Sequence, residues 1–391
     1  MCDIKKIIIS LFFTVPLSGA LDSVAKILPI RDLQRIVASY LDDYLYDQDI
    51  DAAPDFIHEV AVSNRGKYLA VSFYDKVQIW RLDNGIYKLM QNIDVDNSGD
   101  LLSRTGFWPL IPHLAFSQNG DFLGITSEYN VFIWQLDGNK FILKQKLPHK
   151  RARSVVFSPD GKSVAASSRN NTISIWQLTK PWGLYRCLYK TDYYALAQKI
   201  TTQSDLLGPI FFARGDTYLI AATKNKTIDI WELRNGLYVK AQELSSKNGD
   251  ISQYAVSRNG TYIAAALNDN SLVLWKFKDN KYVPVEGMKL DNVPNAMALS
   301  PDGTFLALAM GKDIMLFREK NGEFELQELD SSDTIEQKIN DLTFSPDNIF
   351  LVAGLHTRNL IVWQNLEYAF NNVKHEKSKQ KKAEQTITEV D

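Results

Sequence analysis

The chain has 391 residues, of which 45% are hydrophobic and 23% charged, and its formal net charge at pH 7 is −2. This composition is ordinary for a soluble globular protein. The slightly negative charge argues against nucleic acid as a partner, because phosphate binding requires a concentrated basic surface. The two cysteines, Cys2 and Cys187, match no paired metal-ligand spacing and are too few for a disulfide-rich scaffold. The length favours either several domains or one repeat architecture.

Residues 1–20 have the three parts of a secretory signal peptide. Lys5 and Lys6 precede an apolar run over residues 7–17, and small residues follow up to a cleavage point after Ala20. The run is too short for a stable membrane span. We therefore expect an exported protein, periplasmic or secreted. The alternative is a cytoplasmic protein in which this segment is a buried helix or strand.

Residues 21–45 are expected to hold an amphipathic helix that starts at about residue 28. Pro29 suits its first turn. Its apolar residues fall on one face, where they recur at spacings of three and four: Leu33, Ile36, Val37, Tyr40, Leu41 and Tyr44. The Leu-Pro start resembles the first helix of an F-box, which would imply an adaptor that presents substrates to a ubiquitin ligase. The later F-box helices have no room before the repeats begin, so a helix packed against the rest of the fold is the preferred interpretation.

A repeat of about 45 residues occupies the chain from about residue 55 to about residue 365. Each copy ends in an aromatic residue that follows an aliphatic one: Trp80, Trp134, Trp176, Trp231, Trp275, Phe317 and Trp363. A turn residue precedes each of these aromatics by 14 or 15 positions: Gly66, Gly120, Gly161, Asp216, Gly260, Gly303 and Asn348. Gly, Asn and Asp tolerate the positive φ of a tight hairpin, so this position predicts a turn between two strands.

Each copy predicts four strands. A short apolar strand such as 155–157 precedes the turn, and a run of small residues such as 264–266 follows it. Small side chains in a continuous strand indicate that both of its faces are closely covered. The third strand alternates, as at Ile173 and Ile175, which is typical of a half-buried sheet. A fourth, outer strand has an aromatic residue seven positions after the terminal one in most copies: Tyr87, Phe141, Tyr238, Tyr282 and Phe324.

The motif Phe-Ser-Pro-Asp-Gly at 157–161, and the aliphatic-Trp pair that ends the repeats, resemble the WD-repeat family. The resemblance implies an all-β, seven-bladed β-propeller over residues 46–373, preceded by a short helical segment. It also implies that the seven terminal aromatics are structural and pack between blades. The Asp that usually follows the Trp is absent, and only His149 lies near the expected place of the family's Gly-His pair. The buried Asp-His-Ser-Trp network of the family is therefore expected to be missing.

Closure of the ring has two possible solutions. The segment 44–50 has the spacing of an outer strand before the first blade, and we expect it to complete blade 7. The alternative is the segment 365–370, because Phe370 lies seven positions after Trp363. The tail 374–391 is charged and poor in apolar residues, which predicts disorder.

Catalytic motifs are not found in the sequence. The glycine-rich phosphate-binding and nucleophile-elbow motifs are missing, and the five histidines are dispersed over different repeats: His58, His113, His149, His356 and His375. We therefore expect no catalytic residue, no cofactor and no metal site. A propeller can also gather residues from several blades around its central channel, so a propeller enzyme or small-ligand binder remains the alternative.

The expected function is a non-enzymatic scaffold, monomeric, that binds a protein or peptide through one rim of the propeller. The loops 92–113 and 186–209 are enlarged, and we expect both on that rim. Aromatic and Arg side chains dominate binding hot spots. The candidate partner-binding residues are Trp108, Tyr193, Tyr194, Arg151 and Arg153.

Overall fold

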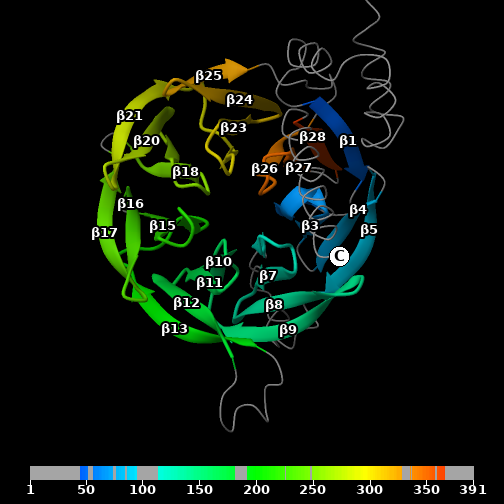
Figure 1. Cartoon of the computed structure of the whole chain (residues 1–391). Helices are drawn as coiled ribbons and strands as arrows, with labels where there is room; N and C mark the ends of the chain where they lie inside the picture. The colour runs from blue at the N-terminus through cyan, green and yellow to red at the C-terminus, as the bar shows by residue number, and fades with distance from the viewer. Residues whose placement is uncertain are drawn as a thin grey trace, which may run out of the picture.

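Seven four-stranded antiparallel sheets stand around a common axis like the blades of a propeller (Figure 1). The computed structural model describes residues 45–51, 56–73, 76–83, 86–94, 113–180, 192–224, 226–246, 249–327, 335, 337–356 and 359–365. The predicted all-β fold and the blade count of seven are confirmed. The predicted signal peptide (1–20), the helical segment up to residue 44 and the tail (374–391) lie outside the described residues. Within those residues, the one helical element is the 3-10 turn η1 (Asn64–Gly66), and none is long and apolar enough to cross a lipid bilayer.

The blades follow one another in chain order. Blade 1 consists of β2 (Glu59–Val62), β3 (Tyr68–Ser72), β4 (Lys76–Asp83) and β5 (Ile86–Asp94). Blades 2 and 3 consist of β6 (Leu114–Phe116), β7 (Phe122–Thr126), β8 (Asn130–Asp137) and β9 (Lys140–Pro148), and of β10 (Ala152–Phe157), β11 (Ser163–Ser168), β12 (Thr172–Thr179) and β13 (Tyr193–Thr201). Blades 4 and 5 consist of β14 (Phe211–Ala213), β15 (Tyr218–Thr223), β16 (Thr227–Arg234) and β17 (Leu237–Ser245), and of β18 (Ile251–Val256), β19 (Tyr262–Leu267), β20 (Ser271–Lys278) and β21 (Lys281–Lys289).

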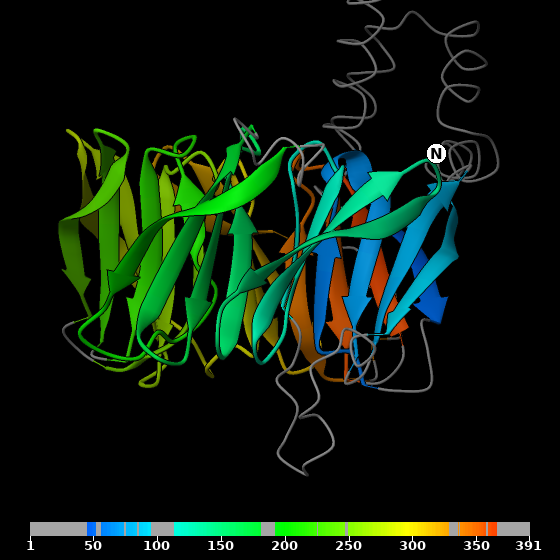
Figure 2. The same cartoon turned by 90° about the horizontal axis from the view of Figure 1, so that it is seen from below.

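Blade 6 consists of β22 (Ala296–Leu299), β23 (Phe305–Met310), β24 (Asp313–Lys320) and β25 (Glu323–Gln327), and blade 7 of β26 (Ile339–Phe344), β27 (Phe350–Leu355), β28 (Asn359–Gln364) and β1 (Leu45–Asp51). The first strand of each blade lies nearest the axis and the fourth forms the circumference (Figure 1). Seen edge-on, the strands run from one rim of the ring to the other (Figure 2).

The ring is closed by β1, which comes from the start of the described chain and pairs antiparallel with β28 in blade 7. The expected closure by residues 44–50 is therefore confirmed for the described part of that segment. Ile50 is buried in the cluster between blades 7 and 1, together with Val60, Leu360 and Val362. The two ends of the repeat region are thus joined by backbone hydrogen bonds and by a shared core.

Serine side chains hold the turns between the first and second strands. In six blades the Oγ of a serine accepts the N–H of the residue five positions later at 2.8–2.9 Å: Ser63, Ser117, Ser158, Ser257, Ser300 and Ser345. Blade 4 has Ala213 at this position. Gly66 shows why the turn selects glycine, because its φ is +59° and a Cβ there would lie 2.5 Å from the ring of Phe350.

Glutamine side chains tie the outer strands of neighbouring blades together. In four successive blades a glutamine amide both donates to the carbonyl and accepts the N–H of an aromatic residue in the next outer strand, at 2.8–2.9 Å: Gln91 with Phe141, Gln145 with Tyr194, Gln198 with Tyr238 and Gln242 with Tyr282. Tyr194 also donates its hydroxyl to the carbonyl of Gly161 at 2.8 Å. These contacts satisfy backbone groups that an outer strand would otherwise leave unpaired.

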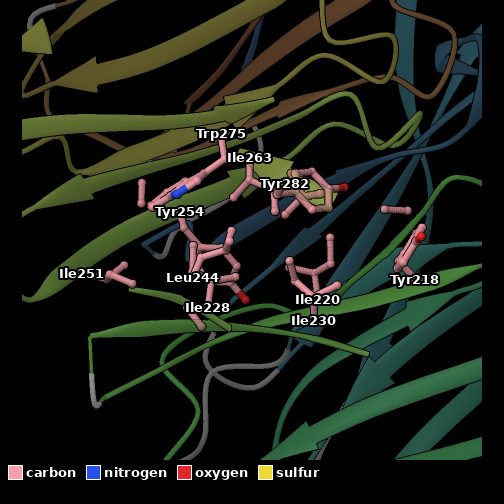
Figure 3. Packing of buried hydrophobic residues seen from close by; sticks show 14 of the residues in the cluster. Tyr218, Ile220, Ile228, Ile230, Leu244, Ile251, Tyr254, Ile263, Trp275 and Tyr282 are labelled. Atoms are coloured by element: carbon pink, nitrogen blue, oxygen red, sulfur yellow. The ribbon is translucent and has the colours of Figure 1, made fainter. Parts of the chain in front are cut away.

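The hydrophobic core is divided among the junctions between blades. Figure 3 shows the junction of blades 4 and 5, where Ile220 and Ile230 face Ile263, Trp275 and Tyr282. Each terminal aromatic lies in or against the cluster between its own blade and the preceding one: Trp80, Trp134, Trp176, Trp231, Trp275, Phe317 and Trp363. The small second-strand residues are fully buried, as at Ala264 and Ala265. Neighbouring blades can therefore approach closely, and the indole and phenyl rings fill the space further out.

Candidate functional site

The antiparallel blades give the ring two different rims. Rim A carries the connections from each outer strand to the next blade and from each second strand to the third. Rim B carries the serine-held turns and the connections from the third to the fourth strand. The first strands start at rim A and end at rim B, so residues at their starts gather around the axis at rim A.

Polar side chains at the starts of four first strands form an axial network on rim A, which we define as Asp341, Glu59, His113 and Ser154. Each accepts a backbone N–H from the next blade: Val60 to Asp341 Oδ2 at 2.8 Å, Leu114 to Glu59 Oε1 at 3.1 Å, Val155 to His113 Nδ1 at 3.4 Å and Ile210 to Ser154 Oγ at 3.1 Å. The network therefore runs across blades 7, 1, 2, 3 and 4. Its members lie in positions far apart in sequence, and only the closed ring brings them together.

The hydrogen bonds of His113 fix its tautomer. Its Nδ1 accepts the N–H of Val155, so Nε2 carries the ring proton in the neutral form. Nε2 lies 3.3 Å from Glu59 Oε1. Burial lowers the pKa of His113 to about 4, and the neutral ring is therefore the form expected at physiological pH.

The two carboxyl groups of the axial network have altered proton affinities. Burial raises the pKa of Asp341 to about 7, although two backbone N–H donors oppose the shift. Burial also raises the pKa of Glu59 well above its usual value, and the negative charge of Asp341 adds to the effect. The side chains of Glu59 and His113 are each 19% exposed, so they remain reachable from rim A. The site can thus offer a cation or a hydrogen-bond donor two carboxyl groups next to a neutral imidazole.

Among the described residues, no group of three or more His, Cys, Asp or Glu side chains is placed to hold a metal ion. The side chains of the axial network form hydrogen bonds from one blade to the next. The sequence pattern indicates none of these residues as a site, because the histidines are dispersed over different repeats. Glu59 and Asp341 are 282 positions apart and have no local motif that could have revealed them.

The two predicted arginines lie on rim A. Arg151 is exposed and its Nε lies 3.6 Å from Glu128 Oε1. Arg153 donates from Nη1 to the carbonyl of Leu206 in the connection that leads to blade 4, at 3.1 Å. Burial lowers the pKa of Arg153, and the nearby Arg169 adds to this. Arg151 is therefore exposed and paired only at the surface, while Arg153 joins two blades.

The assignment of Tyr193 and Tyr194 to a loop on the same rim is wrong. Both residues belong to β13, the outer strand of blade 3, and they lie at its rim B end opposite Thr179 and Leu178. Tyr194 is buried and occupies the position of the aromatic residue that the other outer strands carry. The sequence pattern missed this equivalence because residues 181–191 lengthen the connection before β13. Tyr193 is partly exposed on rim B, and Trp108 lies outside the described residues.

The comparison with known families agrees with the repeat pattern. The family described as WD domain, G-beta repeat matches residues 142–177 and 326–364. Each match begins in the outer strand of one blade and ends with the third strand of the next, so the sequence repeat is offset by one strand from the blade. The same offset explains why β1 is left to close blade 7. No curated protein matches the chain.

Proposed function

The chain is a WD-repeat protein folded as a seven-bladed β-propeller, and from this premise we propose that it is a non-enzymatic scaffold which binds a protein or peptide partner through rim A. The observation that carries the choice of rim is the convergence of Asp341 and Glu59 near the axis, within reach of solvent. Carboxyl groups at a surface select partners that bring hydrogen-bond donors or positive charge to them.

The chemistry of rim A favours a partner with a basic or amide side chain at its centre. Glu59 and Asp341 can accept hydrogen bonds from such a group, and Arg151 at the periphery can pair with an acidic residue. Trp108, which the sequence predicts to contribute to this surface, belongs to the segment 95–112 outside the described residues.

A peptide selection with matched variants tests this function. Peptides selected from a random library on the immobilised chain are titrated against Glu59→Gln, Arg151→Glu, Trp108→Ala and the rim B variants Lys162→Glu and Tyr193→Ala, with folding checked by circular dichroism. We expect the rim A variants to weaken binding by about tenfold or more and the rim B variants to leave it unchanged. Peptides that bind all rim A variants as well as the parent chain would refute the choice of rim.

A small-ligand binder or enzyme that uses the central channel is the second candidate, and the axial network is the observation that favours it. Groups with shifted pKa values, such as Asp341 and His113, concentrate in functional sites. However, each carboxyl group of the network already accepts a backbone N–H of the next blade, as a structural tie does. A catalytic reading requires that Glu59→Gln abolish turnover of some substrate while stability is retained.

Export is a further part of the proposal. The observation that supports it is the three-part pattern of residues 1–20. Sequencing the N-terminus of the protein isolated from its natural source decides the matter. Leu21 as the first residue is expected, whereas Met1 or Cys2 on cytosolic protein bound to a ligase adaptor would favour the F-box interpretation instead.

A further inference from the structure

The serine-held turns surround the axis on rim B, and the residue after each serine differs between blades. Three blades have proline there: Pro159, Pro301 and Pro346. Blade 2 has Gln118 and blade 5 has Arg258 at the same position. These two side chains are long and polar where three other blades have the short apolar ring of proline, and Asn64 and Arg214 take this place in blades 1 and 4.

Arg258 and Gln118 meet across the mouth of the ring. Arg258 Nη2 donates to Gln118 Oε1 at 3.2 Å. Blades 2 and 5 are three steps apart in a ring of seven, so they share no junction and the contact has to run across the interior. The guanidinium group of Arg258 therefore lies near the axis at rim B.

The positive charge of Arg258 has no carboxylate partner among the described residues. Other arginines of the same rim are engaged: Arg214 lies 4.3 Å from the centre of the Phe277 ring, and Arg234 Nη2 lies 2.6 Å from Glu232 Oε2. Burial lowers the pKa of Arg258, and no neighbouring charge contributes to the shift. A half-buried cation without a counter-charge is a costly arrangement that an anion would relieve.

The amide of Gln118 is oriented by this contact. A guanidinium group only donates hydrogen bonds, so the amide oxygen has to face Arg258 and the amide NH2 group is left to donate elsewhere. The remaining N–H groups of Arg258 are also donors. Both side chains thus have N–H groups left to donate to a third group, and the acceptor that suits a guanidinium fork beside an oriented amide is an oxyanion with two oxygens.

We propose that Arg258 and Gln118 form an oxyanion-binding site at the rim B mouth of the propeller, which takes a carboxylate or phosphate group. The site lies on the opposite rim from the proposed partner surface and does not depend on it. It gives the molecule a second means of recognition, for an acidic terminus or side chain or for a phosphorylated group that approaches from rim B.

Anion titrations at constant ionic strength test the site. Acetate and inorganic phosphate, each exchanged against chloride, are titrated into the full chain by calorimetry, and the two probes separate carboxylate from phosphate recognition. Saturable binding of at least one probe is expected, with about tenfold or greater loss in Arg258→Met. Arg258→Lys should bind more weakly than the parent chain, because an ammonium group lacks the planar fork.

Gln118→Glu provides the sharpest variant, because it keeps the guanidinium group and supplies the missing carboxylate from within the chain. It should abolish binding of both probes and should not lower stability. This variant therefore still tests the site if Arg258→Met does not fold. Arg234→Gln, an exposed arginine of the same rim, serves as the matched control and should bind as the parent chain does. Absence of saturable binding of both anions to the parent chain, or undiminished binding by Gln118→Glu, would overturn the proposal.

Discussion

Single side chains carry much of the cohesion between neighbouring blades, and the glutamine contacts of the outer strands show how. Gln198 donates to the carbonyl of Tyr238 at 2.9 Å and accepts its N–H at 2.8 Å. Gln198→Met retains the volume but leaves both backbone groups without these partners. We expect the free energy of unfolding in urea to fall by about 1–3 kcal/mol, the cost of partly buried polar groups that lose their hydrogen bonds.

Lys199→Met is the matched control for this variant, since Lys199 is the exposed neighbour on the same strand. Its effect should stay within about 0.5 kcal/mol, as is usual for surface substitutions. Equal effects of the two variants would show that the glutamine contact adds nothing to the stability of the ring.

The carboxyl group of Asp341 predicts a dependence of stability on pH. Burial raises its pKa in the folded chain from the usual 3.8 to about 7. Between these two values the folded state holds a proton that the unfolded state has lost, so stability falls as pH rises from about 4 to about 7. Asp341→Asn should remove this loss. The stability of the parent chain minus that of the variant should therefore decrease over this range, by at most about 1.4 kcal/mol per pH unit, and level off above pH 7.

Two histidines change the stability in the opposite direction with pH. The stability of Asp341→Asn therefore has to be subtracted from that of the parent chain. Burial lowers the pKa of His113 and of His149 to about 4, so each contributes stability that is lost as pH falls from about 6.5 towards 4. Both histidines are present in the parent chain and in Asp341→Asn, and their contributions cancel in the difference. Urea unfolding at several pH values measures it, and a difference that does not change with pH would contradict a raised pKa for Asp341.

Individual strands differ in how much the ring depends on them, and β1 is the strand that joins its two ends. Ile50 is buried between blades 7 and 1. Ile50→Ala should lower the free energy of unfolding by about 2–4 kcal/mol, the usual cost of truncating a buried aliphatic side chain. Leu237→Ala removes a half-exposed leucine from the outer strand β17 and should cost less than about 1 kcal/mol. If both variants unfold alike in urea, the closure does not rest on β1.

Strand position could be predicted where the repeat is regular and failed where it is interrupted. The turn glycines and the terminal aromatics keep a constant spacing within each blade, because the first three strands are joined by short turns. That spacing predicted blades such as β18–β21 correctly. In blade 3 the longer connection before β13 shifts the outer strand along the sequence. Tyr194 therefore lies more than seven positions after Trp176, and the sequence pattern placed it in a loop. Its burial and its contact with Gln145 depend on pairing with β12, which local sequence does not encode.

The polar contacts near the axis were beyond prediction for a different reason. Asp341 and Val60 become neighbours only after 281 residues have formed a closed ring, and Arg258 reaches Gln118 only because blades 2 and 5 face each other across it. The repeat does not mark these positions, because at the place of Gln118 and Arg258 three other blades have proline. Packing positions repeat and can be read from one chain, whereas site residues are the exceptions to the repeat.

The ring as a unit presents opposite chemistry at its two mouths. Rim A has the carboxyl groups of Asp341 and Glu59 near the axis, and rim B has the guanidinium group of Arg258. In blade 5 the rim A and rim B ends of the first strand, β18, are about five residues apart, or about 16 Å of extended chain. At physiological salt the Debye length is about 8 Å, so charges at one mouth are largely screened from the other.

Independence of the two rims is the resulting prediction. Glu59→Gln should change the affinity for acetate or phosphate by less than about twofold, and Arg258→Lys should change the affinity for rim A peptides by less than about twofold, because sites this far apart couple by about 0.5 kcal/mol or less. The double variant should show both single effects unaltered. Calorimetric titrations of each ligand against all four proteins measure this. A larger mutual effect would mean that the seven first strands move together, so that occupation of one mouth reshapes the other.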